Sequence, residues 1–233
     1  DEIKIAVYTE SFGGPLFPSE ESIHFIRTWE AESYRQGVSL GAGARKRLDE
    51  KIAIVTGGAQ GFGKGIAEAM AGEGANVVIA DLNAAGAAAT AAGIESAYGT
   101  GHAIAVGVNV ADEESVEAMV AETVLAYGGL DVLINNAGIA RAGNLDEMDL
   151  KTFDLVTQIN YHAYFLCAKY SAKIMKIQFS ANPDYSMDII QINSKSGLSG
   201  SNKNFAYAGS KFGGICWTGL CGPTLKPVCL SST

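Results

Sequence analysis

Residues 51–65 read KIAIVTGGAQGFGKG, and this stretch decides the fold. It joins an apolar, β-branched run at 51–56 to a glycine-rich turn, and the turn leads directly into an Ala-rich amphipathic segment. A strand, a turn and a helix in this order form the first unit of a parallel sheet, and glycines at the turn let the backbone approach a phosphate group. The stretch therefore predicts a βα unit that binds a nucleotide.

Short apolar runs and longer amphipathic stretches continue to alternate along the chain, which is typical of βα units on a parallel sheet. Strands are predicted at 51–56, 76–80, 103–108, 131–135 and 187–193, and helices near 62–73, 83–98, 112–127 and 148–178, with a last helix beginning near Phe205. Because the strand segments are almost continuously hydrophobic, we expect helices to cover both faces of the sheet. The predicted fold class is α/β, with a Rossmann-type doubly wound parallel sheet.

The two ends of the chain depart from this alternation. Residues 1–50 contain Gly and Pro breaks, one amphipathic stretch at 20–36 and a linker-like stretch at 37–47. We expect them to form an N-terminal extension, or the tail of an upstream segment, outside the sheet. Glycines and prolines also interrupt the helical pattern soon after Lys211. Residues 51–233 are therefore expected to form a truncated domain whose sheet is incomplete at its C-terminal edge, without a sixth strand.

Composition and charge restrict the possible partners. The 233 residues include 17 Lys and Arg against 25 Asp and Glu, and the resulting net charge of −8 disfavours binding to nucleic acid or anionic membranes. No apolar run is long enough to span a bilayer, and residues 1–10 do not have the basic region and apolar core that are typical of a secretion signal. The four cysteines have no paired spacing, and the three histidines do not cluster with other metal ligands. We expect a cytoplasmic protein with a small-molecule partner and no metal.

The glycine loop Thr56–Gly63 admits two nucleotide-binding interpretations. A P-loop needs Ser or Thr after its lysine to hold magnesium, and Gly65 stands at that position. A dinucleotide site is favoured by Asp81, which closes the second strand, where a carboxylate can accept hydrogen bonds from both hydroxyls of an adenosine ribose. Its charge would repel a 2′-phosphate, and no Arg or Lys follows directly, so the sequence favours NAD over NADP. The alternative that Asp81 caps the next helix stays open.

A second group of candidate residues lies towards the C-terminus. Tyr207 and Lys211 are one helical turn apart, which places the phenol and the ammonium on one helix face. A neighbouring ammonium favours the phenolate and brings the tyrosine pKa closer to neutral, as general acid–base catalysis requires. Ser194 ends the fifth strand, where its hydroxyl can hold a substrate oxygen against the phenol. Asn135–Gly138 follow the fourth strand at the ligand-binding edge of the sheet, whereas Asn160 lies in the long helix and needs a polar partner.

Together these motifs resemble the classical short-chain dehydrogenase/reductase family over about residues 50–215. The TGxxxGxG pattern is present at Thr56, Gly57, Gly61 and Gly63, the NNAG pattern at Asn135–Gly138, and the catalytic set at Asn160, Ser194, Tyr207 and Lys211. The resemblance implies an NAD(H)-dependent oxidoreductase acting on CH–OH groups. The resemblance further implies that Tyr207 is the general acid/base and that Ser194 orients the reacting oxygen. Lys211 would bind the nicotinamide ribose and lower the tyrosine pKa, and Asn160 would hold a water.

The resemblance also implies a cofactor site, in which Asn109 stands where family members usually have Asp beside the adenine. Its predicted members are Thr56, Gly57, Gln60, Gly61, Phe62, Gly63, Asp81, Asn109, Val110, Asn136, Ala137, Gly138, Tyr207 and Lys211.

Within the family, residues 8–35 and 191–208 resemble the long form of the bacterial sorbitol-6-phosphate 2-dehydrogenases. That resemblance implies a polyol or sugar phosphate as substrate, with D-sorbitol 6-phosphate oxidised to D-fructose 6-phosphate. No Asp or Glu follows Asp188, whereas lysines near the predicted catalytic residues can bind a substrate phosphate. The alternative is that these lysines are solvated loop residues. The predicted substrate contacts are Ser194, Lys195, Lys203 and Tyr207.

Other functions remain open at this point. The chain can be a truncated dinucleotide-binding module without turnover, or a short-chain dehydrogenase that acts on another alcohol or ketone. A sugar-nucleotide epimerase of the extended family would favour GxxGxxG over the spacing present here. The family resemblance implies a homo-oligomer, and the truncated tail weakens that expectation because it would expose one edge of the sheet.

Overall fold

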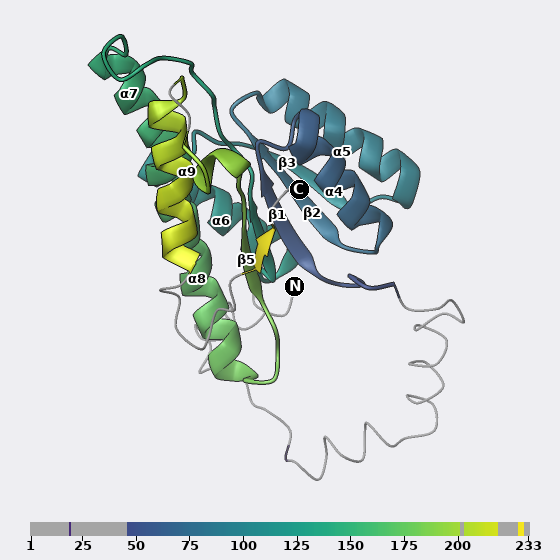
Figure 1. The fold of residues 1–233 in the computed structure, drawn as a ribbon. Helices are drawn as coiled ribbons and strands as arrows, with labels where there is room; N and C mark the ends of the chain where they lie inside the picture. Colours follow the sequence, from purple (N-terminus) through teal and green to yellow (C-terminus); the bar gives the residue numbers. More distant parts are fainter. Residues whose placement is uncertain (1–18, 20–45, 201–202, 219–227, 231–233) are drawn as a thin grey trace. The chain divides into compact units, whose positions relative to one another are not determined.

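The computed structural model describes residues 19, 46–200, 203–218 and 228–230 (Figure 1). The chain divides into two units, Asp1–Arg47 and Leu48–Thr233, and all the helices and strands named below belong to the second. The amphipathic helix expected at 20–36 lies outside the described residues. The role of the N-terminal extension therefore stays a prediction.

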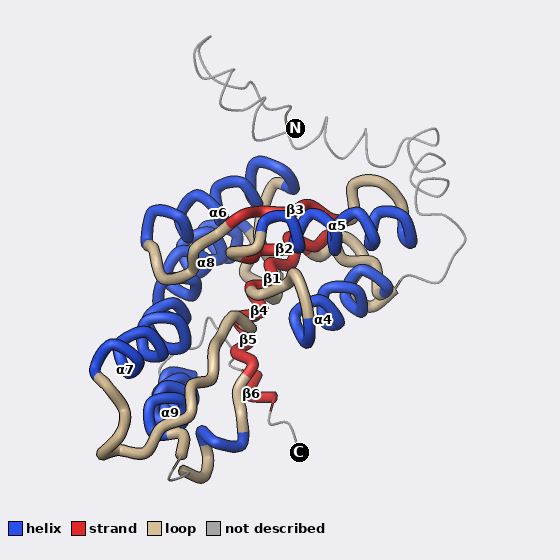
Figure 2. The backbone as a smooth tube through the Cα atoms, turned by 90° about the horizontal axis from the view of Figure 1, so that it is seen from above, coloured by secondary structure: helices blue, strands red, loops and turns tan. Residues whose placement is uncertain are grey.

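A parallel sheet with the strand order β3-β2-β1-β4-β5-β6 forms the centre of the second unit (Figure 2). Its strands are β1 Ile52–Thr56, β2 Asn76–Asp81, β3 Ala103–Gly107, β4 Val132–Asn135, β5 Asp188–Ile192 and β6 Val228–Leu230. The order runs outward in both directions from the β1–β4 pair, so the topological switch point lies at the carboxyl ends of these two strands. The predicted doubly wound α/β fold is confirmed.

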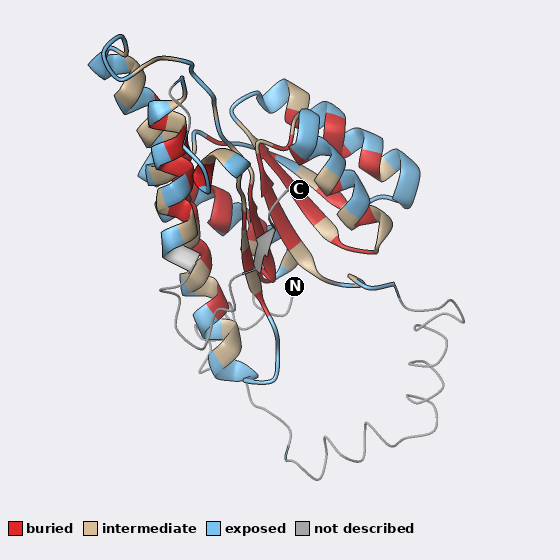
Figure 3. Ribbon diagram, in the orientation of Figure 1, coloured by how far each residue is buried: buried red, intermediate tan, exposed pale blue. Residues whose placement is uncertain are grey.

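Helices cover both faces of this sheet (Figure 2). They are α4 Gly61–Gly72, α5 Ala84–Tyr98, α6 Glu113–Tyr127, α7 Leu150–Thr157, α8 Ala163–Ala181 and α9 Phe205–Thr218. Successive strand residues point to opposite faces. Ile54 and Val78 accordingly pack in one core cluster with residues of α6 and α8, and Val55 and Ile79 pack in another with residues of α4 and α5. Buried residues therefore lie on both sides of the strands (Figure 3).

The helix predicted near 148–178 is interrupted in the structure. Helices α7 and α8 are joined by a π-helical turn, Gln158–His162. A π turn widens the helix locally and is often found at functional sites. Asn160 lies in this turn and is only 2% exposed, so the irregularity brings a polar side chain into the interior. The periodicity of the sequence does not distinguish such a turn from a continuous helix.

The described residues of the C-terminal part contain more regular secondary structure than the sequence predicts. The expectation of no sixth strand was wrong, because β6 pairs in parallel with β5, with Ile190 opposite Val228 and Ile192 opposite Leu230. Three apolar residues are enough to extend the sheet at this otherwise open edge. Helix α9 also continues through Gly213 and Gly214, although glycine lowers helix stability in the absence of compensating contacts.

Candidate active site

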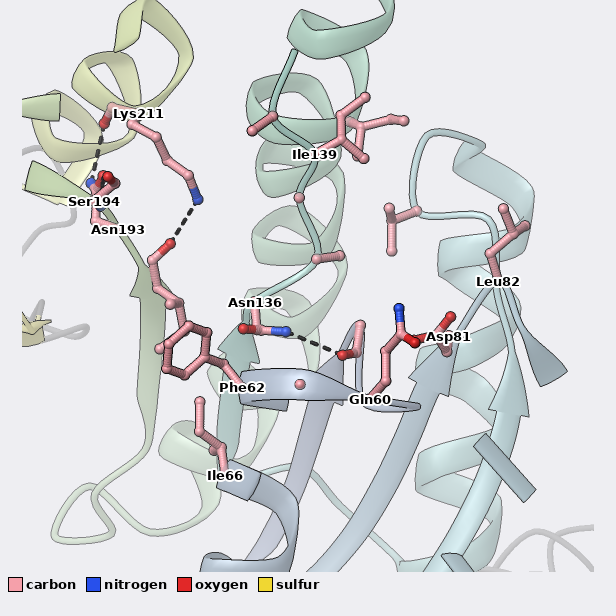
Figure 4. Close-up of a pocket in the computed structure, with 18 of the residues that line it drawn as sticks. Gln60, Phe62, Ile66, Asp81, Leu82, Asn136, Ile139, Asn193, Ser194 and Lys211 are labelled. Carbon is pink, nitrogen blue, oxygen red and sulfur yellow. Dashed lines mark hydrogen bonds between the residues drawn. The ribbon is translucent and has the colours of Figure 1, made fainter. Parts of the chain in front are cut away.

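A pocket of about 820 Å³ lies at the carboxyl ends of the strands (Figure 4). Most of the predicted site residues line it: Gly57, Gln60, Gly61, Phe62, Asp81, Asn109, Val110, Asn136, Ala137, Gly138, Ser194, Tyr207 and Lys211. Figure 4 shows Gln60, Asp81 and Leu82 on one side of the pocket, Ser194 and Lys211 on the other, and Asn136 between them. The fold thus brings the predicted nucleotide-binding and catalytic motifs into one cavity.

Sequence reasoning missed several residues of the pocket wall, and most of them are apolar: Ile66, Leu82, Val108, Ile139, Ala140, Ile159, Ile192 and Asn193. An apolar residue at a strand end has the same pattern whether it faces the core or a ligand, so the sequence contains no signal for most of them. Leu82 directly follows Asp81 and is 77% exposed, so its place in the pocket wall is visible only in the structure.

Thr56 does not line the pocket but connects the two motifs that do. Its side chain is fully buried, and its hydroxyl oxygen accepts hydrogen bonds from the backbone N–H groups of Asn136 (3.0 Å) and Ala137 (3.1 Å). In return, Asn136 Nδ2 donates to the carbonyl oxygens of Thr56 (3.0 Å) and Gly57 (3.2 Å). The glycine loop and the loop after β4 therefore form one hydrogen-bonded unit.

Two glycines of the loop are required by its geometry. Gly57 lines the pocket and has a backbone φ of +65°, a conformation that residues other than glycine rarely adopt. Gly63 is buried, and a Cβ added to it would overlap the carbonyl oxygen of Gly57. The loop therefore stays open only with glycine at both positions. Helix α4 begins at Gly61 without a side-chain cap, so its first N–H groups remain available to a phosphate in the pocket.

Asp81 is positioned by backbone donors. Its Oδ2 accepts from Ala59 N (3.0 Å) and its Oδ1 from Asn83 N (2.9 Å), and each oxygen keeps a lone pair for a further donor. The alternative that Asp81 caps the next helix is wrong, because Asn83 Oδ1 accepts from Gly86 N (3.0 Å) at the start of α5. The carboxylate is therefore available to a ligand in the pocket.

Asn109 and Val110 form the pocket wall after β3. The side-chain oxygen of Asn109 accepts a hydrogen bond from Ala111 N (3.1 Å), and the backbone N–H of Asn109 donates to the Ser115 hydroxyl oxygen (3.0 Å). These bonds hold the loop in a compact turn in front of α6.

Lys211 is the most buried charged group of the site, with 6% of its surface exposed. Its Nζ donates to the carbonyl oxygen of Ile192 (2.8 Å) and lies 5.8 Å from the centre of the Tyr207 ring. Burial of the ammonium lowers the pKa of Lys211 below its ordinary value of 10.5. The predicted Tyr207–Lys211 pair is thus present in the pocket wall, with the ammonium anchored to the end of β5.

Asn160 lies behind the pocket wall rather than in it. Its Oδ1 accepts from Ile139 N (2.8 Å), while its Nδ2 donates to Ile139 O (2.8 Å) and to Ser210 Oγ (3.2 Å). Ser210 Oγ in turn donates to the carbonyl oxygen of Tyr207 (2.8 Å). Asn160 therefore connects the loop after β4 to the backbone of the Tyr207 helix, and the sequence contained no signal for the Ser210 link.

The remaining predicted substrate residues differ in position. Ser194 lines the pocket, and its hydroxyl oxygen accepts from Ser196 N (3.2 Å). Lys195 and Lys203 are exposed and do not belong to the pocket wall. The backbone of Lys203 accepts from Gly143 N (2.9 Å), which joins the segment before α9 to the loop after β4.

A family model described as short chain dehydrogenase matches residues 51–227. The chain belongs to this family. The uncharacterized oxidoreductase YuxG of Bacillus subtilis is 39% identical over 158 residues, which cover 68% of this chain and 22% of that protein. Sorbitol-6-phosphate 2-dehydrogenase of Escherichia coli is 36% identical over 165 residues, which cover 71% of this chain and 62% of that protein.

Among solved structures, sorbitol-6-phosphate 2-dehydrogenase SrlD from Erwinia amylovora superposes with a TM-score of 0.66 at 39% identity, covering 71% of this chain and 63% of that chain. The predicted resemblance to this branch of the family is confirmed. The match spans less than two thirds of each of these relatives.

None of the helices in the described part of the chain is both long and apolar enough to cross a membrane. No group of three or more His, Cys, Asp or Glu side chains among the same residues is placed to hold a metal ion.

Proposed function

We propose that this chain is an oxidoreductase that moves a hydride between NAD(H) and a hydroxyl-bearing carbon of a polyol or sugar phosphate. The observation that carries the proposal is the pocket itself. Ser194, Tyr207 and Lys211 line it together with the glycine loop and Asp81. Figure 4 shows Ser194 and Lys211 on the side of the pocket opposite Gln60 and Asp81. Membership of the short-chain dehydrogenase family supports the same reaction class.

The residues that line the pocket fit the hydrogen-bonding groups of a dinucleotide. Gly57 and Gly63 keep the loop open, and the uncapped start of α4 offers N–H groups to a pyrophosphate. Asp81 would accept hydrogen bonds from the adenosine ribose, and none of the described pocket residues beside it is basic, which favours NAD over NADP. When bound, the nicotinamide accepts or supplies the hydride.

The protein's own groups would then handle the proton and the orientation of the substrate. Tyr207 exchanges the proton with the substrate oxygen, and Ser194 donates a hydrogen bond that holds this oxygen near the phenol. The Lys211 ammonium uses one of its three N–H groups for Ile192 O, so two remain for the nicotinamide ribose.

For the substrate we propose sorbitol 6-phosphate, on the basis of the similarity to the two sorbitol-6-phosphate 2-dehydrogenases. The phosphate would bind at the mouth of the pocket, where Lys195 follows the pocket residue Ser194 and Lys203 precedes α9. Both side chains are exposed, so they can reach a phosphate without a desolvation cost as large as that of a buried lysine.

The direct test is the appearance of NADH absorbance when the protein is mixed with NAD and sorbitol 6-phosphate. The Tyr207→Phe variant should bind NADH normally and show no turnover. Lys195→Ala should raise KM for sorbitol 6-phosphate much more than KM for free sorbitol, and equal effects on both would exclude the phosphate contact. NADH binding without turnover across a panel of polyols and ketones would favour a binding module instead.

We also propose a cytoplasmic location and a homo-oligomeric state, with residues 1–50 as a separate extension. The described cysteines Cys167 and Cys216 are free thiols, which fits a reducing compartment.

A further inference from the structure

Helix α9, which carries Tyr207 and Lys211, contacts three consecutive residues at the end of β5 and in the loop that follows. Lys211 Nζ donates to Ile192 O (2.8 Å), and Asn193 Nδ2 donates to Lys211 O (3.1 Å). The third contact involves the preceding residue, Gln191, whose side chain lies against Gly214. The position of the lysine thus depends on how closely α9 approaches β5.

Two adjacent glycines, Gly213 and Gly214, allow α9 to lie this close to its neighbours. A Cβ added to Gly214 would overlap both the nitrogen and the oxygen of the Gln191 amide. A Cβ added to Gly213 would lie 2.7 Å from Cε2 of Tyr161, which belongs to the π-helical turn. Neighbouring helix residues point in directions about 100° apart, so the pair faces two different elements. Glycine at both positions lets α9 contact β5 and the π turn at once.

Gln191 is an unusual residue for this place. It is 3% exposed, and within the described part of the chain its Oε1 has no hydrogen-bond partner. An unpaired polar atom in the interior is costly and calls for an explanation. An apolar side chain at the same strand position would avoid that cost. The close contact with Gly214 supplies a role for the amide.

We propose that Gly214 is a positioning residue: because it has no side chain, α9 can pack directly on the Gln191 amide, and the resulting distance between α9 and β5 places Lys211 and Tyr207 in the pocket. Gly214 lies one helical turn after Lys211, so a displacement at the glycine moves the lysine with it. The inference rests on the proposed catalytic role of Tyr207 and Lys211.

The test compares Gly214→Ala, Gln191→Ala, the double variant and Gly209→Ala. Gly209 is the matched control, because it lies on the same helix and an added Cβ meets nothing within 4 Å. We expect Gly214→Ala to lower kcat by about 10- to 100-fold, as for a displacement of about 1 Å, with a smaller change in KM. Its pH profile for kcat should shift, since the Tyr207–Lys211 geometry changes. Gly209→Ala should match the parent protein.

The double variant decides the matter. Removing the Gln191 amide makes room for the new methyl group, so kcat and the pH profile should return towards those of the parent protein. A double variant no better than Gly214→Ala, or a Gly214→Ala variant as active as Gly209→Ala, would overturn the proposal. If Gly214→Ala does not fold, recovery of a folded, active double variant supports the proposal, and its failure contradicts it.

Two controls separate this inference from the proposed function. If Tyr207→Phe retains activity, the proposed function fails; if it is inactive while Gly214→Ala is normal, only the positioning role fails. NADH affinity, measured by fluorescence titration, replaces turnover if the parent protein reduces or oxidises nothing in the panel. Gly214→Ala should then weaken NADH binding and the double variant should restore it, and unchanged affinity in Gly214→Ala would refute the proposal.

Discussion

Replacing Thr56 by Val tests whether one buried hydroxyl joins the two cofactor loops. Valine has nearly the same shape but cannot accept the two backbone hydrogen bonds from Asn136 N and Ala137 N. Asn136 N has a second acceptor, Ile134 O at 3.1 Å, so this N–H group would lose one of its two hydrogen bonds and keep the other. Ala137 N would be left as a part-buried donor without its partner, at a cost of about 1–3 kcal/mol.

Thr56→Val is therefore expected to lower the unfolding free energy by about 2–3 kcal/mol, because Ala137 N loses its hydrogen-bond acceptor and Asn136 N loses one of two. For a domain of this size that corresponds to a melting temperature lower by roughly 4–12 °C. Urea denaturation followed by circular dichroism measures the change. Thr56→Ser keeps the hydroxyl and is the control, with a smaller loss from the missing methyl group.

Cofactor binding should respond to Thr56→Val as well, because Gly57 and Ala137 both line the pocket. We expect NADH to bind more weakly to Thr56→Val than to Thr56→Ser. The reasoning is refuted if Thr56→Val unfolds with the free energy of the parent protein, or if Thr56→Ser is equally destabilised.

Three further predictions concern the same pocket. Gly63→Ala should weaken NADH binding by about tenfold or more, equal to about 1.4 kcal/mol, because the new methyl group overlaps Gly57 O; fluorescence titration measures this, and Gly65→Ala, where nothing lies within 4 Å, should bind like the parent protein. Ser210→Ala removes the link between Asn160 and the Tyr207 carbonyl and should lower kcat while NADH affinity stays unchanged; equal loss of both would contradict this role. Burial lowers the pKa of Lys211, so the folded state binds fewer protons than the unfolded state between the folded pKa and 10.5, and the unfolding free energy should rise with pH in that window. Urea denaturation of Lys211→Met across the same window should show a smaller rise, and an identical slope would refute the assignment.

The fold and the cofactor loop were predictable because their determinants are local. A run such as IAIVT is typical of a strand that is buried on both faces, as in a parallel sheet covered by helices, and the spacing of Gly57, Gly61 and Gly63 reflects backbone geometry within one turn. Tyr207 and Lys211 are likewise neighbours on one helix, so their proximity follows from the chain itself.

Contacts between segments distant in the sequence were not predictable in this way. The π turn that buries Asn160, the Ser210 link and the Gln191–Gly214 contact each join elements whose side chains meet only after folding. Asn83 rather than Asp81 caps α5, because Asp81 is already held by Ala59 N.

The amino-acid sequence by itself determined the βα alternation, the glycine loop and the Tyr207–Lys211 pair, since each depends on residues within a few positions of one another. Only the tertiary structure showed which of these groups line the pocket and that Lys195 and Lys203 do not. It also showed that β6 extends the sheet beside β5. The physical reason is that side-chain burial and hydrogen-bond partners depend on how whole elements pack, and β6 pairs with β5, a strand distant from it in the sequence.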